Sequence, residues 1–72
     1  MKSVLVIGAG SIGRRHIQCL KQIGIPDVYV CEPMEENCRQ VCTNFDIRGT
    51  FSSLASAFER HYDGAIICVP NH

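Results

Sequence analysis

Three glycines near the amino terminus have the spacing of a phosphate-binding turn. Gly8, Gly10 and Gly13 form the pattern Gly-x-Gly-x-x-Gly directly after an apolar run. When such a pattern joins a buried strand to a helix, the first glycine makes the turn, the second lets the backbone approach a pyrophosphate, and the third lets helix and strand pack closely. Free backbone N–H groups and the positive end of the helix dipole then hold the anion. The pattern predicts a dinucleotide-binding site, to which we also assign the neighbouring Ser11 and Ile12.

An acidic residue stands where such a site needs one. Glu32 follows the second apolar run, residues 28–31, about 20 positions after the glycines, and a carboxylate there accepts hydrogen bonds from the adenosine ribose. It would also repel a 2′-phosphate, so NAD is expected in preference to NADP. Two alternatives stay open. Glu32 could be a solvated cap of the next helix, and Arg14 or Arg15 could accept a 2′-phosphate instead of forming a solvated first turn.

His16 and His61 are not expected to be catalytic. His16 lies between Ile12 and Leu20 on the apolar side of the first helix, which predicts a packed, hydrogen-bonded histidine instead of an acid or base. His61 falls near the end of the third predicted helix, where a surface position is expected. We therefore assign no catalytic residue within this chain.

The five cysteines are an odd number and contain no Cys-x-x-Cys pair. Cys38 and Cys42 stand one helical turn apart and could share a metal ion, but both fall on the apolar stripe of their helix. We expect plain buried thiols there and no metal site. An odd cysteine count with no apparent secretory leader favours a reducing cytoplasm.

Strand and helix patterns alternate along the chain. Short runs of apolar residues predict strands at 4–7, 28–31, 47–50 and 65–69, and helical spacing predicts helices at 11–23, 34–45 and 54–62. Gly24 is expected to end the first helix, and Ser52 or Ser53 to cap the third. Such alternation specifies a parallel sheet with right-handed crossovers. We predict a Rossmann-like, three-layer α/β fold of about four strands in the order 3-2-1-4, with the first two helices on one face and the third on the other.

Each helix is expected to bury one apolar stripe against the sheet. The predicted stripes are Ile12, Cys19, Leu20 and Ile23 in the first helix, Met34, Cys38, Val41, Cys42 and Phe45 in the second, and Leu54, Ala57, Phe58 and Tyr62 in the third. The outer face of the second helix carries Glu35 and Arg39, a favourable pair one turn apart.

The composition is that of an ordered globular chain. Hydrophobic residues make up 46% of the 72 positions, and seven basic side chains balance seven acidic ones. A balanced charge predicts no general attraction to nucleic acid or to anionic membranes. The apolar run near the amino terminus is too short to span a bilayer or to form the core of a signal peptide.

Three parts of the chain together resemble one family of enzymes. The segment VLVIGAGSIGRRHI, Glu32 and the ending DGAIICVPNH are similar to the Gfo/Idh/MocA oxidoreductases, named for glucose-fructose oxidoreductase and inositol dehydrogenase. The resemblance spans the whole chain. It implies that Val69, Pro70 and Asn71 line the cofactor cleft on the ribose or nicotinamide side. It also implies that the full enzyme transfers hydride between a nicotinamide cofactor and a sugar or polyol.

Members of that family continue to a Glu-Lys-Pro motif with the catalytic lysine, and then to a substrate-binding domain. Residues 1–72 contain neither, so we expect a partial NAD(P)-binding domain. A non-catalytic, nucleotide-sensing regulatory module would need the same glycines and is the main alternative. An FAD-binding segment is disfavoured, because Ile17 stands where such segments carry glycine or alanine. The expected partners are a nicotinamide dinucleotide and a second copy of the chain, paired through the edge strand at 65–69.

Overall fold

Strands and helices alternate along the chain as the sequence predicts. The structure, a computed structural model, describes residues 2–68. In this part of the chain the elements are β1 (Ser3–Ile7), α1 (Ser11–Gln22), β2 (Asp27–Cys31), α2 (Glu35–Asn44), β3 (Gly49–Phe51), α3 (Leu54–Ala57) and β4 (Gly64–Ile67). No helix within the described range is long and apolar enough to cross a membrane.

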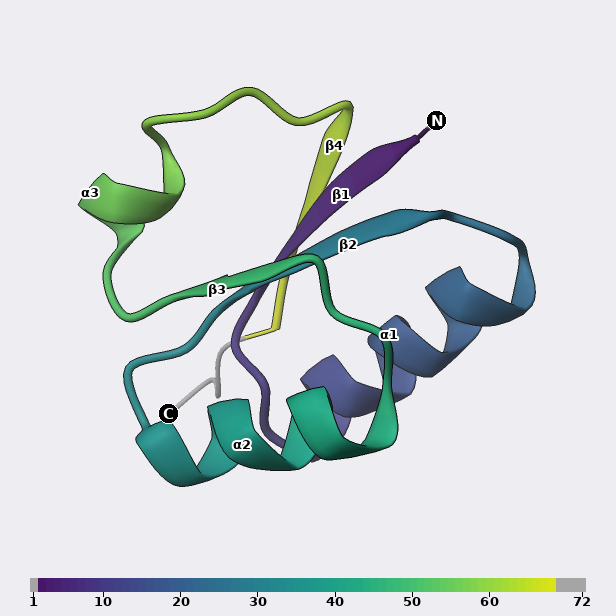
Figure 1. Ribbon diagram of the computed structural model, residues 1–72, viewed down its shortest axis with the longest axis horizontal. Coiled ribbons are helices and arrows are strands. Elements are labelled where there is room, and N and C mark those ends of the chain that lie inside the picture. The colour runs from purple at the N-terminus through teal and green to yellow at the C-terminus, as the bar shows by residue number, and fades with distance from the viewer. Residues whose placement is uncertain (1, 69–72) are drawn as a thin grey trace.

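The four strands form one parallel sheet in the order β3-β2-β1-β4, which confirms the predicted order. Successive residues of a strand face opposite sides of the sheet. Val4 of β1 therefore packs with Ile17 of α1 and Val41 of α2, whereas Leu5 belongs to a second cluster with Ala57 of α3. Figure 1 shows α1 and α2 on one side of the sheet and α3 on the other. The predicted three-layer arrangement is confirmed.

A close backbone contact decides which face of α1 meets the sheet. Gly13 lies so near the turn that a Cβ on it would collide with the carbonyl oxygen of Gly8. Because Gly13 faces β1, the residues one and two turns further along the helix, Ile17 and Leu20, face the sheet as well and are buried. The helix ends before Gly24, whose φ of 85° confirms the predicted glycine cap.

The predicted buried face of α1 is wrong except at Leu20. Ile12, Cys19 and Ile23 are exposed, because the contact of Gly13 turns them away from the sheet. His16 is exposed for the same reason and is not the packed histidine that we expected. His61 lies in the exposed loop beyond α3, not at the end of a helix.

The predicted stripe of α2 is too wide. Val41 is buried and Phe45 packs partly against the core, but Met34 precedes the helix and is exposed. Cys38 is half-buried and Cys42 is exposed, so only some of the expected burial of this thiol pair is seen. Cys42 is adjacent to Val41, so helical geometry turns it about 100° away from the face that meets the sheet. No metal-binding group of three or more His, Cys, Asp or Glu residues occurs in the part of the chain described.

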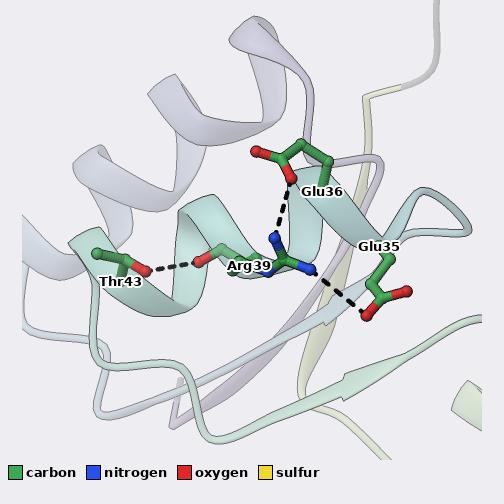
Figure 2. Close-up of polar contacts among 4 residues, drawn as sticks. All are labelled: Glu35, Glu36, Arg39 and Thr43. Atoms are coloured by element: carbon green, nitrogen blue, oxygen red, sulfur yellow. Dashed lines mark hydrogen bonds and ion pairs between the residues drawn. The ribbon is translucent and has the colours of Figure 1, made fainter.

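The outer face of α2 carries the predicted ion pair. Arg39 lies 3.6 Å from Glu35 and 3.3 Å from Glu36, and Thr43 donates a hydrogen bond to the carbonyl of Arg39 (Figure 2). All of these side chains are exposed, so each pair contributes little to stability. This face of α2 is a solvated surface.

The third helix is much shorter than predicted. Ser53 caps it, as expected, but α3 ends at Ala57, which is its only buried residue. Leu54 and Phe58 are exposed because a helix of four residues cannot carry a continuous stripe. Tyr62 is half-buried and packs from the loop that follows.

The edge strands also differ in their limits. β3 begins at Gly49, two residues later than predicted, because Tyr29 of β2 pairs with Gly49 and not with Ile47. β4 ends at Ile67, and the predicted last residue of this strand, Val69, lies outside the described residues.

Candidate functional site

The carboxyl ends of the four strands surround a groove. It has a volume of about 600 Å³ and lies where ligands bind in open parallel α/β sheets. The lining residues are Ile7, Gly8, Gly10, Ser11, Ile12, Cys31, Glu32, Pro33, Met34, Asn37, Ser52, Ser53, Leu54 and Cys68. The groove therefore brings together the glycine turn, the end of β2, the first turn of α2 and the start of α3.

The glycine turn forms one wall of the groove. Gly8 has a φ of 101°, which residues other than glycine rarely adopt. Its N–H donates to the carbonyl of Cys31 at 2.9 Å. Gly10 has an ordinary φ of −73°, and a Cβ there would meet no atom within 4 Å. The backbone conformation thus requires glycine at position 8. At position 10 the fold itself would tolerate a side chain, and glycine there leaves open space beside the backbone. Gly13 does not line the groove but lies against the turn.

The start of α1 is suited to an anion. The first N–H groups of a helix have no partner within the helix, and at α1 no described side chain caps them. Gly10, Ser11 and Ile12, where α1 begins, all line the groove. The first turn also carries no acidic residue that would repel an anion. The helix dipole adds partial positive charge at the same place.

Glu32 is the charged residue in the lining of the groove. Its side chain is only 7% exposed, and each carboxylate oxygen accepts one backbone hydrogen bond. Oε1 accepts the N–H of Ala9 at 2.6 Å, and Oε2 accepts the N–H of Met34 at 3.0 Å. Glu32 is therefore not the solvated glutamate of the alternative interpretation, although it does bond the residue that precedes α2.

The two arginines lie outside this groove. Arg14 is half-buried, and its guanidinium donates to Gln40 of α2 at 2.6 Å. Arg15 is exposed, and both arginines border a separate, open hollow between α1 and the end of α2. Neither arginine belongs to the lining in which Glu32 lies.

Much of the lining could not be found from motifs. Pro33, Met34 and Asn37 come from the start of α2, while Ser52, Ser53 and Leu54 follow β3. The one sequence signal that could have found them is their place just after predicted strands, because the carboxyl ends of parallel strands meet at one edge.

Two thiols also face the groove. Cys31 is the last residue of β2, and Cys68 directly follows β4. Burial raises the pKa of both thiols, and the charge of Glu32 raises that of Cys31 further. Both are therefore neutral and poorly nucleophilic near pH 7. The residues Val69, Pro70 and Asn71, which the resemblance placed in the cofactor cleft, lie outside the described part of the chain.

Comparison with known families agrees with this geometry. The model of the oxidoreductase family Gfo/Idh/MocA, NAD-binding Rossmann fold, matches residues 2–72. The chain belongs to this family. Neither the search of curated proteins nor the search of solved structures gave a match.

Membership in the Gfo/Idh/MocA family explains why the turn, the helix start and Glu32 occur together. The family domain binds NAD through a Rossmann fold, and this chain has that fold with its groove at the carboxyl edge of the sheet. The predicted site residues Gly8, Gly10, Ser11, Ile12 and Glu32 line this single groove.

Proposed function

We propose that the groove binds a nicotinamide dinucleotide and prefers NAD to NADP. The observation that carries the proposal is the buried carboxylate of Glu32 in a groove that is also lined by the start of α1, where no described side chain caps the helix. One wall suits the negative diphosphate, whereas the carboxylate suits neutral ribose hydroxyls and repels a 2′-phosphate. FAD and the regulatory alternative have no separate observation in their favour.

The residues present fit this ligand. The open space beside Gly10 allows close approach of a diphosphate to the N–H groups at the start of α1. Each oxygen of Glu32 has one N–H partner, and a carboxylate oxygen can accept a second hydrogen bond, here from a ribose hydroxyl. The exposed side chains of Met34 and Leu54 offer apolar surface to a base. When bound, the nicotinamide cofactor supplies the hydride chemistry.

The role of the whole protein is a further proposal. From the family resemblance we infer an enzyme that transfers hydride to or from a sugar or polyol, of which residues 1–72 form part of the NAD(P)-binding domain. In this proposal Val69, Pro70 and Asn71 contact the ribose or nicotinamide. Reading the gene beyond codon 72 tests it: an open frame with a Glu-Lys-Pro motif supports the enzyme, and an immediate stop codon supports a binding module.

Titration calorimetry tests the cofactor preference directly. NADH is expected to bind at least about tenfold more tightly than NADPH, which corresponds to about 1.4 kcal/mol. Glu32→Ser removes the carboxylate and should narrow this difference, whereas Glu36→Ser on the outer face of α2 should leave it unchanged. Equal affinity for the two cofactors in the unmodified chain would contradict the assignment of Glu32.

A further inference from the structure

Glu32 joins three walls of the groove through hydrogen bonds. Its carboxylate holds the N–H of Ala9 in the glycine turn and the N–H of Met34 just before α2. Its own N–H donates to the carbonyl of Phe51 at the end of β3 at 2.8 Å, and its carbonyl accepts the thiol of Cys38 at 3.3 Å. A single residue therefore ties the turn after β1 to α2 and to β3.

The bond to Ala9 is the strongest of these contacts. The donor residue is fully buried, the acceptor is a carboxylate, and the N–O distance is 2.6 Å. If the carboxylate were removed, the buried Ala9 N–H would lose the hydrogen-bond partner that it has among residues 2–68. The turn would then have to move to satisfy this group.

From this geometry we infer that Glu32 is a positioning residue for the diphosphate-binding turn, in addition to any contact with the ribose. By holding Ala9 it fixes the backbone that leads into Gly10 and the start of α1, where the anion is expected to bind. This inference rests on the proposed binding of a dinucleotide. It differs from that proposal in predicting that Glu32 matters for ligands it does not touch.

A ligand without the ribose hydroxyls separates the two roles. The probes are NADH and its analogue lacking the 2′- and 3′-hydroxyls of the adenosine ribose. Glu32→Gln cannot accept both backbone hydrogen bonds, because its amide nitrogen only donates. It is expected to weaken the binding of the analogue by about tenfold or more, and that of NADH by at least the same factor, because NADH can also lose a ribose contact. The control Glu35→Gln removes the same charge from an exposed side chain and should leave both affinities unchanged.

Phosphorus NMR of the bound ligand adds a readout that a general loss of stability would not move. The diphosphate resonances are expected to shift in Glu32→Gln relative to the unmodified chain and to Glu35→Gln. Glu32→Asp keeps the negative charge, but its shorter side chain cannot extend to the Ala9 N–H. This variant should therefore show the same shift. Resonances that coincide in all four proteins would overturn the inference.

The remaining outcomes are distinct. If Glu32→Gln weakens only NADH and leaves the analogue unaffected, Glu32 acts through the ribose alone; the inference fails and the proposed function stands. If the unmodified chain binds neither ligand, the proposed function fails and the inference with it. Should the variants not fold, amide exchange in the unmodified chain decides, because rapid exchange at Ala9 would show that the turn is not held.

Discussion

At the scale of single residues, the glycines of the turn perform different tasks that substitutions can separate. Position 10 has an ordinary backbone conformation and open space, so a side chain there meets the ligand instead of the fold. Gly10→Arg is therefore expected to abolish NADH binding in calorimetry while leaving the helical circular dichroism intact. Undiminished affinity would show that this turn does not hold the diphosphate.

A substitution at Gly13, in contrast, is expected to affect the stability of the fold. A methyl group there collides with backbone, the carbonyl of Gly8, which cannot move without displacing β1 or α1. Gly13→Ala should lower the free energy of unfolding by about 1–3 kcal/mol, as overpacking in a well-packed interior does. Urea unfolding measures the change, and Gly10→Ala is the matched control. A Gly13→Ala protein as stable as the control would refute the close contact.

Asp63 is a residue whose charge links stability to pH. Its Oδ2 accepts the N–H groups of Lys2 and Ser3, and these hydrogen bonds, with the Ser3 hydroxyl, lower the pKa of the carboxyl group. Because the folded state holds the ionised form, this contribution is complete above the unfolded pKa of about 4 and is lost as pH falls through the folded value.

Asp63→Asn should therefore lower the free energy of unfolding at pH 7. Below about pH 4, the free energy of unfolding should fall less steeply with acidification in this variant than in the unmodified chain. Urea unfolding at a series of pH values measures both effects. The exposed Asp46 offers the control, since Asp46→Asn removes the same charge from a side chain that forms no hydrogen bond or ion pair within residues 2–68. Identical acid profiles for the two variants would contradict the role of Asp63.

At the scale of elements, the orientation of α1 can be tested by two isoleucines of equal size. Ile17 is fully buried, whereas Ile23 is 74% exposed. Ile17→Ala should cost about 2–5 kcal/mol of unfolding free energy, and Ile23→Ala less than about 0.5 kcal/mol. Thermal or urea unfolding checks the difference. A larger loss of unfolding free energy in Ile23→Ala than in Ile17→Ala would show that α1 buries the face that the apolar spacing predicts.

The same helix shows what sequence can and cannot predict. The order of strands and helices follows from alternating patterns and from the rule of right-handed crossovers, so the sheet order 3-2-1-4 was predictable. The rotation of α1 was not, because it depends on one tertiary contact, that of Gly13 with Gly8. The length of α3 was also not predictable, because its apolar residues continue at helical spacing beyond the end of the helix at Ala57.

The site was predictable to the extent that it depends on local motifs. Gly8, Gly10 and Glu32 were found because a turn, a helix start and a strand end each leave a pattern in the chain. Glu32's bond to Ala9 joins residues 23 positions apart, and no local pattern encodes such a contact. Leu54 was expected in the core, and only the shortness of α3 places it on the groove.

At the scale of the whole molecule, the two faces of the sheet are covered unequally. Within residues 2–68, α1 and α2 cover one face, whereas the other carries the short α3, which lies beside β3 (Figure 1). On that less covered face Leu5 of β1 is in register with Ala65 of β4, and Ile7 is in register with Ile67. Ala65 is exposed, and Ile67 is 71% exposed.

β4 is also an edge of the sheet within the described residues. Cys68 donates its N–H to Ile7, so by the alternation of a strand the backbone groups of Ala65 and Ile67 point away from β1. Unpaired edge groups beside exposed apolar side chains favour pairing with another strand. Antiparallel pairing about a two-fold axis at Ile66 would place Ala65 opposite Ile67 of a second copy and satisfy these groups in both chains.

We therefore expect the chain to dimerise through β4. Light scattering should show an average mass that rises from monomer to dimer with concentration, and the amides of Ala65 and Ile67 should exchange more slowly as it rises. Ile67→Lys places a charge on the edge and should give a monomer at every concentration. Ile23→Lys, at an equally exposed position on α1, should leave the dimer intact. A monomer at all concentrations, with rapid exchange at Ala65 and Ile67, would exclude this pairing.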